Sequence, residues 1–110
     1  MTIERADTLD FATIDSASGD LWLTIIDHLP WEEFEGEHLV LLQNKLNAYL
    51  AAIESGEVSS KVPGAKGRNI VIDIVGKFPP TPTANVFLQK ARAFIEDAGF
   101  RLQYRHSPLD

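Results

Sequence analysis

The sequence predicts an α+β fold: a two-layer sandwich whose four-stranded mixed sheet carries two helices on one face. Four short segments have the β-branched or alternating pattern of strands, and two longer segments repeat apolar residues every three or four positions. Their order is β-β-α-β-α-β. Right-handed crossovers then place both helices on the same side of a growing sheet. The 110 residues fit one domain, residues 1–110.

The first two strands are predicted at 9–15 (LDFATID) and 21–27 (LWLTIID). The intervening SASGD suits a hairpin loop because Gly19 and small polar residues favour turns. In the second strand Leu21, Leu23 and Ile25 share one face. The other face is also apolar, which indicates a strand that is covered on both sides.

A long helix is predicted from about Gly36 to Ser55, where Gly56 is placed to adopt a left-handed conformation that ends it. The polar Asn44, Lys45 and Asn47 are expected away from the centre of its apolar stripe. That stripe consists of Leu39, Leu42, Leu46, Tyr49, Leu50 and Ile53.

Residues 57–69 (EVSSKVPGAKGRN) are interpreted as a mobile loop, because they combine Ser, Gly and Pro with basic residues. A strand follows at 70–75 (IVIDIV). Thr81 is a suitable N-cap, with Pro82 at the first helical position of a helix over 82–98. The segment FRLQYRH, 100–106, alternates as a half-buried strand does.

The sheet face opposite the helices is predicted to be too apolar for a fully solvated surface, although it also carries charged residues. We therefore expect it to be buried, either in a homodimer or under a terminal segment, or else to serve as a ligand surface. The residues expected on this face include Trp22, Val71, Val75, Arg101 and Arg105.

Composition narrows the classes of function. The chain has no cysteine, no signal-peptide pattern and no apolar run long enough for a membrane helix, so we expect a cytoplasmic protein. The net charge is −6, of which residues 27–38 contribute five negative charges. This acidity disfavours nucleic acid and anionic membranes as partners and favours a basic protein. Acidity that merely maintains solubility is the alternative interpretation.

The acidic segment is DHLPWEEFEGEH, residues 27–38. Asp27, His28, Glu33 and His38 are metal-ligand types and also candidate acid–base residues. However, their spacing matches no compact metal signature, and no nucleophile elbow accompanies them. We expect no cofactor or metal, and an enzyme centred on His28 is the alternative function. The plainer interpretation is a strand-to-helix connection whose acids complement the helix dipole.

The same segment is predicted to bind a partner. Its aromatic residues are three apart, so they share one side of a helical turn. Either they cap the core, or they form an anchor inside an acidic rim. The preferred function is a non-enzymatic interaction module, for instance an immunity- or antitoxin-like protein. The residues predicted to contact the partner are Trp31, Glu32, Glu33, Phe34 and Glu35.

The run LTIIDHLPWEEFEGEHLVLLQNKLNAYLAAIESGEV, followed by KFPP and FLQKARAFIEDAGF, resembles a family of small bacterial proteins catalogued only as a domain of unknown function. The resemblance covers nearly the whole chain. Its most specific parts are the Asp-His pair after the second strand and the LLQNKLNAYLAAIESGE helix. It implies a compact domain without an established activity, and it transfers no catalytic residue.

Overall fold

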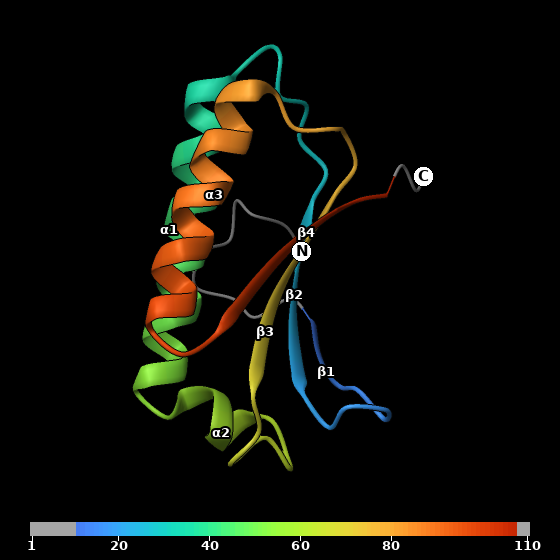
Figure 1. Cartoon of the computed structure of the whole chain (residues 1–110), viewed down its shortest axis with the longest axis vertical. Helices are drawn as coiled ribbons and strands as arrows, with labels where there is room; N and C mark the ends of the chain where they lie inside the picture. Colours follow the sequence, from blue (N-terminus) through green and yellow to red (C-terminus); the bar gives the residue numbers. More distant parts are fainter. Residues whose placement is uncertain (1–10, 108–110) are drawn as a thin grey trace.

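The computed structural model describes residues 11–107 of the chain, which form one sheet and three helices (Figure 1). The predicted first strand began at residue 9, and its first two positions lie outside the described residues. In chain order the elements are β1 (Phe11–Ile14), β2 (Leu21–Asp27), α1 (Glu35–Glu54), α2 (Glu57–Lys61), β3 (Ile70–Gly76), α3 (Pro82–Asp97) and β4 (Arg101–His106).

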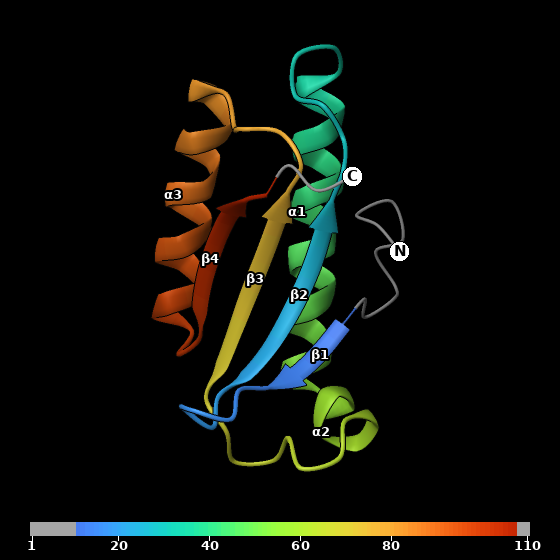
Figure 2. The ribbon, with the colours of Figure 1, turned by 90° about the vertical axis from the view of Figure 1, so that its right-hand side faces the viewer.

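The sheet has the strand order β1-β2-β3-β4, with β1 antiparallel to β2 and the other neighbours parallel (Figure 2). Each parallel pair is joined through a long helix, and both helices, α1 and α3, cover the same face of the sheet (Figure 1). The predicted mixed two-layer sandwich is therefore confirmed. Right-handed crossovers in a sheet that grows in one direction account for the placement of both helices.

The core lies between the sheet and the two helices. Leu21, Leu23 and Ile25 of β2 are fully buried on the helix-facing side, and Ile72 and Ile74 lie beside them on β3. Burying each such side chain stabilises the fold by about 1.5–3 kcal/mol. On α1 the buried positions follow the predicted stripe, with Leu42, Leu46, Tyr49 and Leu50 facing the sheet.

The helix boundaries follow from local chemistry. The Thr81 hydroxyl accepts a hydrogen bond from the Ala84 amide at 3.1 Å, and Pro82 follows as the first helical residue, as predicted. Gly56 has a φ of 86°, the left-handed conformation expected after α1. The two long helices therefore begin and end within one residue of their predicted limits.

Two predictions about local structure are wrong. Residues 57–61 form the short helix α2 instead of a loop, because Val58 packs into the core and Lys61 pairs with Glu57 one turn away at 2.6 Å. Lys45 does not lie on the outer side of α1. It is fully buried, and its ammonium group lies 5.4 Å from the centre of the Tyr49 ring, an aromatic contact that favours a cation.

The parallel strands β2, β3 and β4 all end at the same edge of the sheet (Figure 2). The connection from β2 to α1, residues 28–34, and the connection from β3 to α3, residues 77–81, both lie at this edge (Figure 1). Ligand sites in such sheets concentrate at the carboxyl ends of strands. None of the helices formed by residues 11–107 is both long enough and apolar enough to cross a membrane.

Candidate functional site

A buried Asp–His pair fixes the start of α1 to the end of β2. The Asp27 carboxylate and His38 Nε2 are 2.6 Å apart, and both side chains are about 1% exposed. The other carboxylate oxygen of Asp27 accepts a hydrogen bond from the Leu29 amide at 3.2 Å. The last residue of a strand thus holds both the following loop and the next helix.

Both ring nitrogens of His38 face oxygen acceptors. Nε2 faces the Asp27 carboxylate, and Nδ1 lies 3.3 Å from the Pro30 carbonyl oxygen. The Trp31 ring is stacked on the imidazole at a centroid distance of 3.5 Å and is itself 2% exposed. His38 therefore has no free nitrogen for a substrate or metal in this arrangement. Its role is to fold residues 28–34 tightly against the core.

A tyrosine supports the same corner from β4. The Tyr104 hydroxyl donates a hydrogen bond to the Phe78 carbonyl oxygen at 2.9 Å. Burial raises the pKa of this phenol and the Asp27 charge adds to the rise, while the nearby Trp31 indole opposes it. The buried Trp31 Nε1 nevertheless makes no hydrogen bond of normal geometry within the described part of the chain. Tyr104 therefore holds the connection from β3 to α3 at the carboxyl edge of the sheet.

The side chains predicted to bind a partner divide into buried and exposed groups. Trp31 is buried, whereas Phe34 is 61% exposed. Glu32 and Glu33 are exposed, and Glu35 is half-buried, with its carboxylate accepting a hydrogen bond from the Thr81 hydroxyl. The two aromatic residues therefore do not form one exposed pair. Trp31 supports the loop from inside, and Phe34 presents a ring to solvent.

Two shallow hollows lie on the first turns of α1, and Phe34 lines one of them. One, of about 180 Å³, is bounded by Leu29, Phe34 and Leu41, and the other, of about 310 Å³, by Val40 and Leu41. The Glu37 side chain lines both hollows. Val40 is 55% exposed and adds a second apolar side chain to this surface. We call the following residues the acidic surface: Glu32, Glu33, Phe34, Glu37 and Val40.

The four side chains considered as metal ligands or acid–base residues do not converge. Only Asp27 and His38 meet, whereas His28 and Glu33 are exposed. Within residues 11–107, no three His, Cys, Asp or Glu residues are grouped as a metal ion requires. An enzyme centred on His28 therefore gains no support from the geometry.

The strand register places the predicted residues of the open sheet face side by side. Trp22, Val71 and Arg101 occupy one row across β2, β3 and β4, while Val75 and Arg105 lie in another. Between the rows, the fully buried Asp73 accepts hydrogen bonds from Arg105 at 2.7 and 3.1 Å, and these bonds raise the pKa of the arginine. Val71 is 1% exposed in the single chain, so part of this face is already covered, and dimerisation through it remains a prediction.

A family model described as DUF6572, a family of unknown function, matches residues 1–108. The chain belongs to DUF6572. No curated protein and no solved structure matches the chain. Membership of DUF6572 agrees with the resemblance noted from the sequence and assigns no activity, so the site must be argued from its own geometry.

Sequence reasoning missed one residue of the acidic surface in this DUF6572 member, and it missed the burial of the Asp27–His38 pair. Val40 lies outside the apolar stripe of α1, and a valine on the polar side of a helix was a usable signal. The burial of Asp27 and His38 could not be read from spacing, because they are eleven positions apart and meet only when the loop folds back. The negative charge that faces solvent therefore comes from the glutamates.

Proposed function

We propose that this protein is an interaction module that binds a basic protein segment through the acidic surface. The observation that carries the proposal is Phe34, which is 61% exposed, lines a hollow together with Glu37 and directly follows the exposed Glu32 and Glu33 in the chain. A solvent-exposed aromatic ring is costly to leave unburied and is a common anchor of interfaces. The carboxylates around it favour a partner that carries Lys or Arg beside an apolar residue.

Rigid support strengthens this proposal. The loop that carries Glu32, Glu33 and Phe34 is tied down by the Asp27–His38 pair and by the stacked Trp31. A surface that is already ordered loses little conformational entropy when a partner binds. The hollows on the first turns of α1 would receive apolar side chains of the partner, while Glu37, which lines both, would pair with a neighbouring cation.

The charge distribution supports the same class of partner. Net charge is −6 for the whole chain, and residues 27–38 contain no lysine or arginine. An acidic surface accelerates encounter with a cationic partner, and the effect weakens as salt rises. A neutralising protein of the immunity or antitoxin type is one concrete form of this function, and it is proposed on charge alone.

The test is binding of a fluorescent amphipathic peptide made of Lys and Leu, compared with a Glu/Leu peptide of the same length. We expect the Lys/Leu peptide to bind and the Glu/Leu peptide not to bind. Reversing Glu32, Glu33 and Glu37 to Lys should weaken binding at least tenfold, because interface charges then repel the peptide. Phe34→Ser should weaken it similarly while leaving the salt dependence in place.

The matched control is a triple reversal elsewhere, in which the exposed Glu54, Glu96 and Asp97 become Lys. It changes the net charge by the same amount, and two of its sites lie at the end of α3, where cations suit the helix dipole. Equal loss of binding in both triple variants would show that net charge alone attracts the peptide. That result would refute the acidic surface as the binding site.

A further inference from the structure

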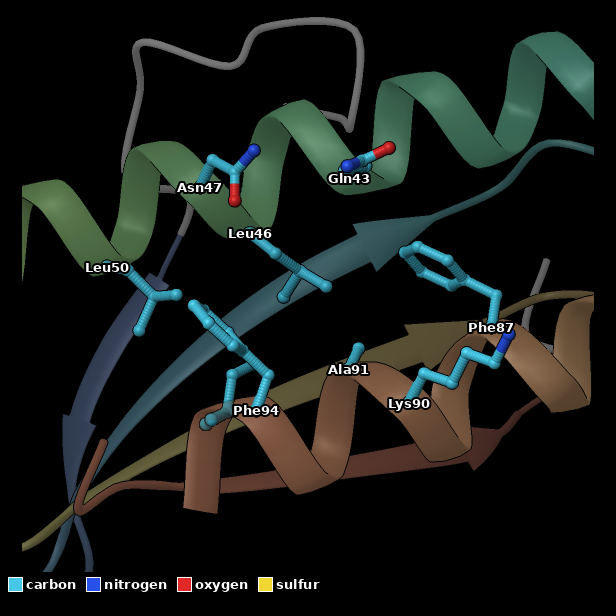
Figure 3. A pocket seen from close by; sticks show the side chains of 9 residues that line it. Gln43, Leu46, Asn47, Leu50, Phe87, Lys90, Ala91 and Phe94 are labelled. Atoms are coloured by element: carbon cyan, nitrogen blue, oxygen red, sulfur yellow. The ribbon is translucent and has the colours of Figure 1, made fainter. Parts of the chain in front are cut away.

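A second surface lies where α1 faces α3. A groove of about 280 Å³ lies between the two helices (Figure 3). Figure 3 shows Phe87 and Phe94 at its two ends, with Ala91 between them and Leu46 and Leu50 reaching across from α1. Its volume is close to the roughly 300 Å³ at which small-ligand pockets begin.

The groove results from residue size. Phe87, Ala91, Phe94 and Ile95 follow one face of α3 at helical spacing, and Ala91 is the small residue among them. A larger side chain at this position would fill the space between the helices. Phe94 is 66% exposed, so the apolar lining continues to the surface. This lining shares no residue with the acidic surface or with the two hollows on the first turns of α1.

The polar side chains of the described residues that line the groove include a positive charge and no negative charge. Among the described residues that line it, Lys90 alone carries a charge, and Gln43 and Asn47 add neutral amides on the α1 side. The Lys90 side chain is exposed and lies along α3, with its nitrogen towards the Phe87 end of the groove (Figure 3). In a protein with a net charge of −6, this apolar groove is thus bordered by a cation and hydrogen-bond donors.

We propose that the groove binds a small amphipathic carboxylate. Its hydrocarbon part would lie on Ala91 between Phe87 and Phe94, where it removes apolar surface from water. Its carboxylate would pair with the Lys90 ammonium at the α3 side of the groove. Charge complementarity at Lys90 selects an anion over a neutral or cationic ligand of the same length.

The test uses octanoate as the probe and octan-1-ol as its neutral counterpart, with binding followed by amide chemical shifts of the full chain. We expect octanoate to shift resonances of residues 43–50 and 87–95. Lys90→Gln should weaken octanoate binding about two- to fivefold, the range that an exposed ion pair supplies, and should leave octan-1-ol unchanged. Arg92→Gln is the matched control, because Arg92 is exposed on the same helix and does not line the groove.

Filling the groove provides the decisive variant. Ala91→Phe should abolish binding of both probes, and Ala91→Leu serves the same purpose if the larger side chain prevents folding, as judged by circular dichroism. Octanoate binding that survives both replacements, or an equal effect of Lys90→Gln and Arg92→Gln, would overturn the proposal. It would also be overturned if the groove signals depended on protein concentration instead of octanoate, because a second copy of the chain would then be the occupant.

Discussion

At the scale of single residues, His38 is the side chain on which the candidate site depends most. It contacts the Asp27 carboxylate, the Pro30 carbonyl oxygen and the Trp31 ring while being almost fully buried. His28, only one position after Asp27, is exposed. The two histidines of the same segment therefore have different structural roles, and comparing them separates a general effect of losing imidazole from an effect of the buried pair.

We predict that His38→Ala lowers the free energy of unfolding by about 3–5 kcal/mol, because it leaves a buried carboxylate without its partner. His28→Ala should change it by no more than about 0.5 kcal/mol, as exposed substitutions usually do. Urea denaturation of the two variants measures both values. Losses of similar size in the two variants would contradict the role assigned to the Asp27–His38 pair.

Tyr104 gives a prediction at alkaline pH. Its pKa is raised above the ordinary value of 10.0, chiefly by burial. The unfolded chain therefore ionises this phenol first as the pH rises. The contribution of the neutral phenol to the free energy of unfolding should be full below pH 10 and should decrease above it. In Tyr104→Phe this contribution is absent, and the decline above pH 10 should be shallower. Thermal unfolding at pH 8 and above pH 10 tests this, and parallel declines in the two proteins would contradict it.

At the scale of the elements, Thr81 joins the starts of the two long helices. Its hydroxyl oxygen accepts from the Ala84 amide as the N-cap of α3, and the hydroxyl donates to the Glu35 carboxylate in the first turn of α1. Thr81→Ala should cost about 1–2 kcal/mol of stability, the usual loss for an N-cap. Thr81→Ser, which keeps the hydroxyl, should cost much less. Equal losses in the two variants, measured by urea denaturation, would show that the methyl group matters instead.

Replacing glycine by alanine should change the stability of the fold in opposite directions at two positions in different elements. A Cβ added to Gly76 of β3 would lie 1.9 Å from the Tyr104 hydroxyl, whereas at Gly36 of α1 it would meet nothing within 4 Å. Gly76→Ala should therefore destabilise by about 1–3 kcal/mol through overpacking. Gly36→Ala should stabilise by up to about 1 kcal/mol, because alanine favours the helix. A neutral Gly76→Ala variant would mean that Tyr104 can move aside freely.

At the scale of the whole molecule, the sequence was sufficient for the architecture and insufficient for the site. The apolar stripes of α1 and α3 and the β-branched segment 70–75 have strong periodicity, so element order and a mixed sheet could be predicted. The burial of Lys45 and the helix α2 could not be predicted, because both depend on tertiary contacts, including the packing of Val58 into the core. Likewise, composition indicated an acidic segment but not which of its side chains face solvent.

The folded molecule presents two apolar surfaces that share no lining residue. The acidic surface combines the exposed Phe34 with glutamates, and the groove beside α3 is bordered by Lys90. Their opposite charge predicts different ligands, a basic protein segment for the first and a small anion for the second. Neither surface uses the open sheet face, so a dimer formed through that face would leave both accessible.

The most direct measurement of the central claim is a map of amide chemical-shift changes on adding the Lys/Leu peptide to the full-length protein. We predict that the largest changes fall in residues 29–41, around Phe34, and that they decrease as salt is raised. The groove between α1 and α3 should remain unaffected. Changes spread evenly over all acidic residues, or centred on the groove or on the sheet face, would contradict the assignment of partner binding to the acidic surface.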